Sequence, residues 1–84
     1  SILRNQINKL DEELFSMIFK RMNIAKKIGK IKVQHNIEIT NNKRENELIK
    51  HIISLPYNNL DQDEIESIYR LFFSISKKRQ DNYK

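Results

Sequence analysis

The fold is decided by residues 1–33, SILRNQINKLDEELFSMIFKRMNIAKKIGKIKV, because their apolar side chains recur at alternating steps of three and four. This stripe consists of Leu3, Ile7, Leu10, Leu14, Met17, Ile24, Ile28 and Ile31. Arg21 occupies the position between Met17 and Ile24 where the series calls for another apolar residue. The pattern predicts a first helix over about residues 1–33, roughly 50 Å long at about 1.5 Å per residue.

Two shorter helices are predicted in the rest of the chain. One Gly and one Pro in 84 residues leave few places for turns between strands. Helical periodicity predicts a second helix over about 42–54, which ends before Pro56, and a third over about 62–82. Their apolar faces are formed by Leu48, Ile49, Ile52 and Ile53 and by Ile65, Ile68, Tyr69, Leu71, Phe72 and Ile75. The predicted fold class is all-α, with one long and two shorter helices.

Each shorter helix is preceded by a start signal. Asn42 with Glu45, and Asp61 with Glu64, have the three-residue spacing of a capping box, in which two side chains satisfy exposed backbone N–H groups. Thr40 and Asn41 are further candidate N-caps for the second helix.

The length of the first helix predicts a second subunit. Two short helices cover only part of its apolar stripe, and a single domain spanning residues 1–84 buries little surface by itself. We therefore expect an intertwined homodimeric helical bundle.

Composition excludes several classes of protein. The chain has no Cys, and His35 and His51 lack metal-ligand spacing, so we expect no metal site. No apolar run approaches the roughly 20 residues that span a bilayer, and Ser1 begins no recognisable signal peptide, so we expect a cytoplasmic protein with no membrane partner. A net charge of +5 favours an anionic partner.

Polar residues interrupt the apolar faces of all three predicted helices. Arg21 and Lys32 share one face of the first helix, and a buried guanidinium needs an anion; the alternative is that Arg21 reaches solvent or pairs with an internal Glu. Ser76 and Gln80 continue the line of Phe72 on the third helix, or else form a frayed last turn. The second helix carries Arg44 and Glu45 in its first turn, where capping also explains the Glu.

Arg4 lies 17 residues before Arg21, about 25 Å along a continuous helix, so one chain cannot bring both to one small ligand. In an antiparallel or crossing pair of first helices, Arg4 of one chain could lie beside Arg21 and Lys32 of the other.

These residues resemble the helical chorismate mutases over nearly the whole chain. Three segments are similar to the family pattern in order and spacing: Leu3-Arg4 through Ile7, Leu10-Asp11, Leu14, Arg21, Ala25 and Gly29 to Lys32; Asn41-Asn42-Lys43-Arg44-Glu45; and Ile68-Tyr69 through Ser76 to Gln80. Asn41 stands where the family commonly has Asp. The resemblance implies an enzyme of aromatic amino acid biosynthesis, in the shikimate pathway, that rearranges chorismate to prephenate without a cofactor.

The resemblance also implies roles for individual residues. Arg21 and Arg4 of the partner subunit would bind the two substrate carboxylates, and Lys32 and Gln80 the ether oxygen. Glu45 and the backbone near Asn41 would hold the ring hydroxyl, and Arg44 and Ser76 would complete the polar wall. The catalytic residues would be Arg4, Arg21, Lys32, Glu45 and Gln80.

Three other functions are weighed against this one. An isochorismate pyruvate-lyase would use a similar pocket, although Glu45 and Gln80 favour the mutase. The charge and Lys77-Lys78-Arg79 suggest a nucleic-acid-binding module, but no helix-turn-helix spacing appears, so no nucleic-acid partner is expected. A non-catalytic helical dimerisation module would explain the stripe but not the polar positions.

Overall fold

The computed structural model describes residues 1–38, 41–56 and 59–81, and it confirms the all-α class. The helices are α1 (Ile2–Gln34), α2 (Asn42–Ile53) and α3 (Gln62–Asp81). Their ends lie within one residue of those predicted, except that Asn82, the predicted end of the third helix, lies outside the described residues. None of these helices is long and apolar enough to cross a membrane.

Local hydrogen bonds explain where α1 begins and ends. The Ser1 hydroxyl accepts a hydrogen bond from the Arg4 backbone N–H at 3.3 Å, which caps the first turn. At the other end Asn36 adopts a φ of 54°, a left-handed conformation that Asn tolerates better than most residues. The Ile37 N–H then bonds the Lys32 carbonyl at 2.8 Å and closes the helix end.

The starts of the two shorter helices differ from each other. The predicted capping box of Asp61 and Glu64 is confirmed, with reciprocal bonds of 3.0 and 2.8 Å. The predicted box of Asn42 and Glu45 is wrong, because Asn41 is the N-cap and its Oδ1 accepts the Arg44 N–H at 3.0 Å. Glu45 is thereby left available for contacts with α3.

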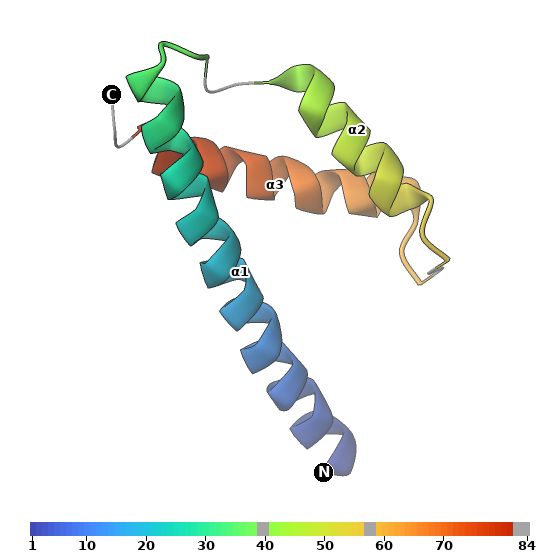
Figure 1. The fold of residues 1–84 in the computed structure, drawn as a ribbon. Helices are drawn as coiled ribbons and strands as arrows, with labels where there is room; N and C mark the ends of the chain where they lie inside the picture. Colours follow the sequence, from blue (N-terminus) through green and yellow to red (C-terminus); the bar gives the residue numbers. More distant parts are fainter. Residues whose placement is uncertain (39–40, 57–58, 82–84) are drawn as a thin grey trace.

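The third helix holds the structure together. α3 crosses the C-terminal half of α1 and also packs against α2 (Figure 1). At the crossing with α1, a Cβ on Gly29 would lie 2.5 Å from the Gln80 Cα, closer than atoms can pack. Only Gly permits this approach of the two backbones. The small described core contains Met22, Ala25, Ile49 and Phe73.

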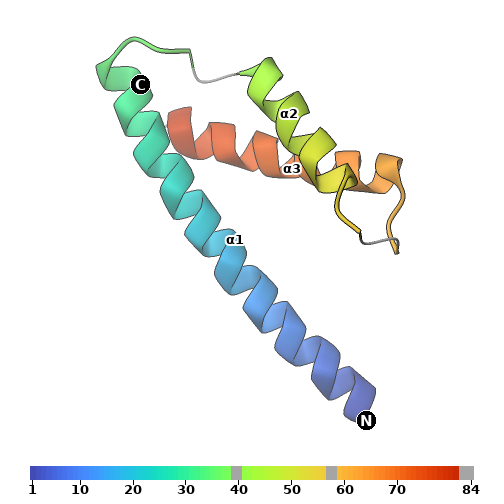
Figure 2. The ribbon, with the colours of Figure 1, turned by 45° about the vertical axis from the view of Figure 1, so that its right-hand side comes forward.

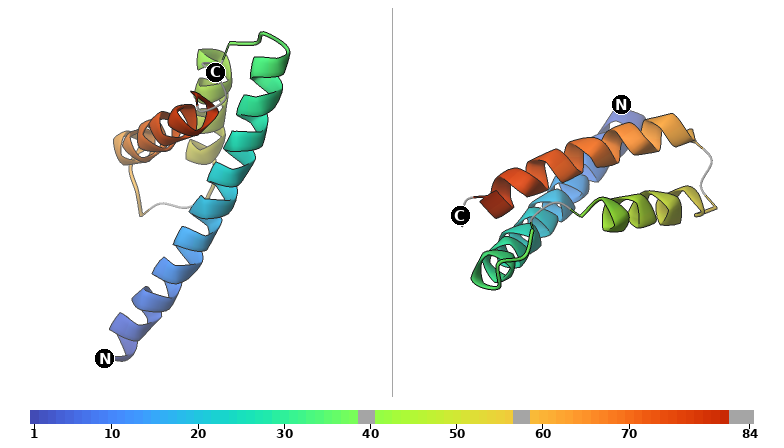
Figure 3. Two further views of the ribbon diagram at one scale, coloured as in Figure 1. Left: turned by 90° about the vertical axis from the view of Figure 1, so that its left-hand side faces the viewer. Right: turned by 90° about the horizontal axis from the view of Figure 1, so that it is seen from above.

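The N-terminal half of α1 extends beyond the other two helices (Figures 1 and 2, and the left view of Figure 3). Its apolar stripe is in the open: Leu3 is 72% exposed, Leu10 60% and Met17 65%. The radius of gyration is 15.3 Å, against about 12 Å for a compact chain of this length. The accessible surface is 7143 Å², roughly 1,800 Å² above the expectation for a compact monomer. The single chain therefore presents a large apolar surface that its own helices do not cover.

Candidate functional site

One cavity of about 500 Å³ lies between the three helices, within the size range of sites for small molecules. The lining residues are Arg21, Ile24, Ala25, Ile28 and Lys32 from α1, Asn41, Arg44, Glu45 and Leu48 from α2 and its cap, and Phe73, Ser76, Lys77 and Gln80 from α3. Apolar groups form much of the wall, and charged side chains from all three helices line the same space.

Arg21 is fixed in the wall of this cavity by contacts with α3. Its Nη1 donates to the Ser76 Oγ at 2.8 Å, and its guanidinium lies 5.6 Å from the centre of the Phe72 ring. The side chain is half-buried, and no Glu pairs with it in the contacts of the described residues. Arg21 thus keeps donors for a ligand anion. Lys32 is also half-buried and lines the same cavity, so the two cations predicted to share one face of α1 do so.

The face of α3 that carries Ser76 and Gln80 is buried against the rest of the structure. Ser76 is 7% exposed and Gln80 9%, so the interpretation of a frayed last turn is wrong for these two residues. Packing against Gly29 explains the burial of Gln80, because the missing side chain lets α3 lie directly on α1. Ser76 is in contact with Arg21 and Met22 of α1.

Gln80 carries a polar atom that the fold does not satisfy. Its Oε1 is buried and has no hydrogen-bond partner among the described residues. A buried unpaired acceptor typically costs about 1–3 kcal/mol. The amide group can meet a ligand with its oxygen or, after rotation, with its N–H donors. This residue is therefore suited to bind a polar group inside the cavity.

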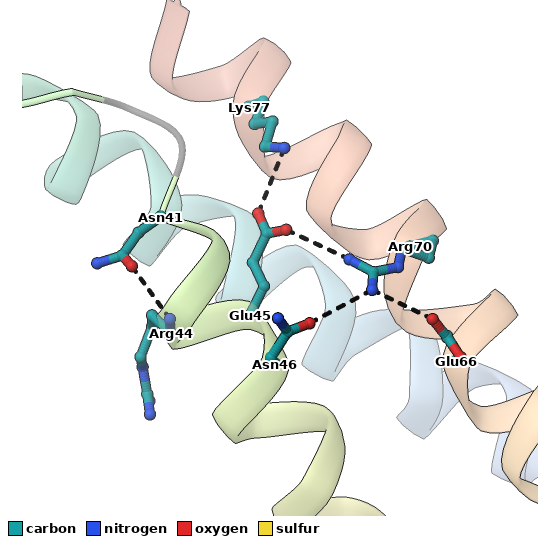
Figure 4. Close-up of polar contacts among 7 residues, drawn as sticks. All are labelled: Asn41, Arg44, Glu45, Asn46, Glu66, Arg70 and Lys77. Carbon is teal, nitrogen blue, oxygen red and sulfur yellow. Dashed lines mark hydrogen bonds and ion pairs between the residues drawn. The ribbon is translucent and has the colours of Figure 1, made fainter.

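The wall contributed by α2 is shown in Figure 4. Glu45 does not cap its helix: its Oε2 lies 3.3 Å from the Lys77 Nζ and its Oε1 3.6 Å from the Arg70 Nη1. Arg44 points away from Glu45, and Asn41 turns its Oδ1 to the Arg44 backbone. The carboxylate of Glu45 is thus held between α2 and α3.

Seven of the eight predicted site residues line this one cavity: Arg21, Lys32, Asn41, Arg44, Glu45, Ser76 and Gln80. The eighth, Arg4, is exposed near the far end of α1. The sequence reasoning missed Lys77, which was noticed only as part of a basic run. Its position three residues before Gln80, where helical side chains are neighbours, was the available signal.

The charge of the lining suits an anion. The lining contains four cations, Arg21, Lys32, Arg44 and Lys77, and one carboxylate, Glu45, which gives a formal charge of +3. In the described part of the chain, no three His, Asp or Glu side chains gather where they could hold a metal ion. The lining thus offers fixed cations and hydrogen-bonding groups to a small anionic molecule.

Comparison with known proteins gives the family. The model of chorismate mutase type II matches residues 3–81. The chain is 38% identical over 53 residues, 63% of its length, to a bifunctional chorismate mutase/prephenate dehydratase of Aquifex aeolicus. It is 28% identical over 82 residues, 96% of its length, to the T-protein of Haemophilus influenzae. The matches span 15% and 22% of these two relatives. The chain belongs to the chorismate mutase type II family.

Proposed function

We propose that this chain catalyses the rearrangement of chorismate to prephenate. The observation that carries the proposal is the cavity that Arg21, Lys32 and Gln80 line together. Its lining has a net positive charge, and its volume suits a small molecule. The family membership of residues 3–81 supports the same activity.

The chemistry of the reaction matches what this lining offers. The rearrangement is intramolecular: one carbon–oxygen bond breaks while one carbon–carbon bond forms, so neither a nucleophile nor a general base is needed. Catalysis requires a compact substrate conformer and positive charge near the ether oxygen, which gains negative charge in the transition state. Fixed cations in a partly enclosed site meet both requirements, because they need not reorganise during the reaction.

Individual residues take the following roles in the proposal. Arg21, already oriented by Ser76 and Phe72, binds one carboxylate of the substrate. Lys32 and the amide of Gln80 bind the ether oxygen, and the buried polar atom of Gln80 supports this role. Glu45 and the backbone near Asn41 hold the ring hydroxyl, and Arg44 completes the polar wall.

A homodimer with shared sites completes the proposal. Arg4 is too far along α1 to reach the cavity of its own chain, and the apolar stripe beside it is exposed. Roughly 1,800 Å² of surface beyond the expectation for a compact monomer is sufficient for a stable subunit interface. Two crossed α1 helices would bury the stripe and bring Arg4 of the partner subunit to the second substrate carboxylate.

A spectrophotometric assay tests the activity directly. Chorismate should disappear at a rate proportional to enzyme concentration, and prephenate should be the product identified by mass spectrometry. Isochorismate, assayed in parallel, should release no pyruvate. Loss of chorismate without prephenate, or no turnover by folded protein, would contradict the proposed function.

A further inference from the structure

Glu45 is the acidic residue of the cavity, and α3 clamps it from two sides. Its side chain is 12% exposed, and each carboxylate oxygen faces a different cation: Oε2 faces Lys77 Nζ at 3.3 Å and Oε1 faces Arg70 Nη1 at 3.6 Å (Figure 4). The two cations come from different turns of α3 and contact different oxygens of the carboxylate, so they restrict its direction as well as offsetting its charge.

The two cations differ in what else holds them. Arg70 also bonds Glu66 at 3.1 Å and the Asn46 Oδ1 at 3.5 Å, and it does not line the cavity. Lys77 does line the cavity, with its side chain 35% exposed. Arg70 is therefore an anchor outside the site, whereas Lys77 stands between Glu45 and the space that a ligand would enter.

We propose that Lys77 is a positioning residue that acts through Glu45. This inference rests on the proposed function. A bare carboxylate in the lining would repel a substrate that carries two negative charges, and without Lys77 it would be drawn towards Arg70 and away from the cavity. Lys77 offsets that repulsion and keeps Glu45 aimed at the substrate hydroxyl. Since the repulsion acts on the bound substrate and the transition state alike, its main effect is on KM.

The experiment compares single variants in the chorismate assay. Lys77→Met should raise KM about tenfold while kcat changes less than about threefold. Lys77→Arg should stay near wild type, because it keeps the charge beside Glu45. Lys78→Met is the matched control: Lys78 is the next residue along α3, is exposed and lies outside the cavity lining, so KM should not change. Thermal unfolding followed by circular dichroism shows whether each variant is folded, and Lys77→Gln replaces Lys77→Met if that variant is not.

A double variant separates positioning from direct contact with substrate. In a Glu45→Gln background, Lys77→Met should change KM less than about threefold, because the charge it offsets is gone. If Glu45→Gln is too slow to assay, calorimetric titration with prephenate gives the same comparison through Kd. An undiminished effect of Lys77→Met in that background would overturn the positioning role, as would an unchanged KM for Lys77→Met alone in an active enzyme. A wild-type chain without turnover would instead count against the proposed function itself.

Discussion

Replacing Leu10 with Glu should dissociate the homodimer that the exposed stripe of α1 predicts. Leu10 is 60% exposed in the single chain and lies in the N-terminal half of α1, which spans Ile2–Gln34. Burying one Leu side chain stabilises the dimer by about 1.5–3 kcal/mol, and a two-fold symmetric dimer loses two such side chains when Leu10 is replaced. Two buried carboxylates would add several kcal/mol of desolvation. A total of at least about 6 kcal/mol weakens the dimer roughly ten-thousandfold.

Sedimentation equilibrium of wild type and Leu10→Glu at micromolar concentration measures whether the substitution weakens the dimer to this extent. We expect a dimer for the wild type and monomeric or unfolded chain for the variant, with chorismate mutase activity lost in parallel. Asn5→Glu adds the same charge on the side of α1 away from the stripe, so it should remain dimeric and active. A dimeric, fully active Leu10→Glu would refute the argument, and so would a monomeric wild type.

Three further substitutions test the site and the helix contacts that build it. Lys32→Ala should leave the dimer intact and slow turnover at least a few hundredfold, since a fixed cation in such a site contributes about 3–4 kcal/mol; turnover like that of wild type would remove Lys32 from the mechanism. Gly29→Ala gains about 1 kcal/mol of helix propensity, but its Cβ meets the backbone of Gln80 at 2.5 Å. The clash should dominate, with a net loss of roughly 1–2 kcal/mol and a lower Tm, and a Tm at or above wild type would show that α3 can shift at no cost. Asn41→Asp keeps the cap and adds a negative charge, which is favoured at a helix N-terminus. The free energy of unfolding should therefore rise by about 0.3–1 kcal/mol, and a lower Tm would contradict the capping role.

The helices could be predicted from the sequence because their signals are local. Steps of three and four in the apolar residues, together with the Asp61 and Glu64 box, are set by neighbours along the chain. The capping box placed on Asn42 failed for a nonlocal reason. Glu45 bonds Lys77 and Arg70 of α3 instead of its own backbone, and Asn41 takes over the cap.

The candidate site could be predicted only in part. Arg21 and Gln80 were conspicuous because they are polar residues on apolar faces, and both line the cavity. Lys77 was not conspicuous, since a Lys inside a basic run near a helix end is usually solvated. Its pairing with Glu45 depends on how α2 lies against α3, and no spacing within one helix predicts that contact. The close approach at Gly29 is nonlocal in the same way, because it requires the position of Gln80 on another helix.

Mixing two inactive variants tests the shared site most directly. Arg4→Ala and Arg21→Ala should each lose most chorismate mutase activity alone. In a hybrid dimer one site combines Arg21 of the Arg4→Ala chain with Arg4 of the Arg21→Ala chain, and the other site lacks both arginines. Equal mixing with random exchange makes half of the dimers hybrids, so roughly a quarter of wild-type activity should return. Native mass spectrometry of chains with different tags verifies that exchange has occurred. Recovery near a quarter is the predicted result, whereas verified hybrids no more active than their parents would contradict a site built from two subunits.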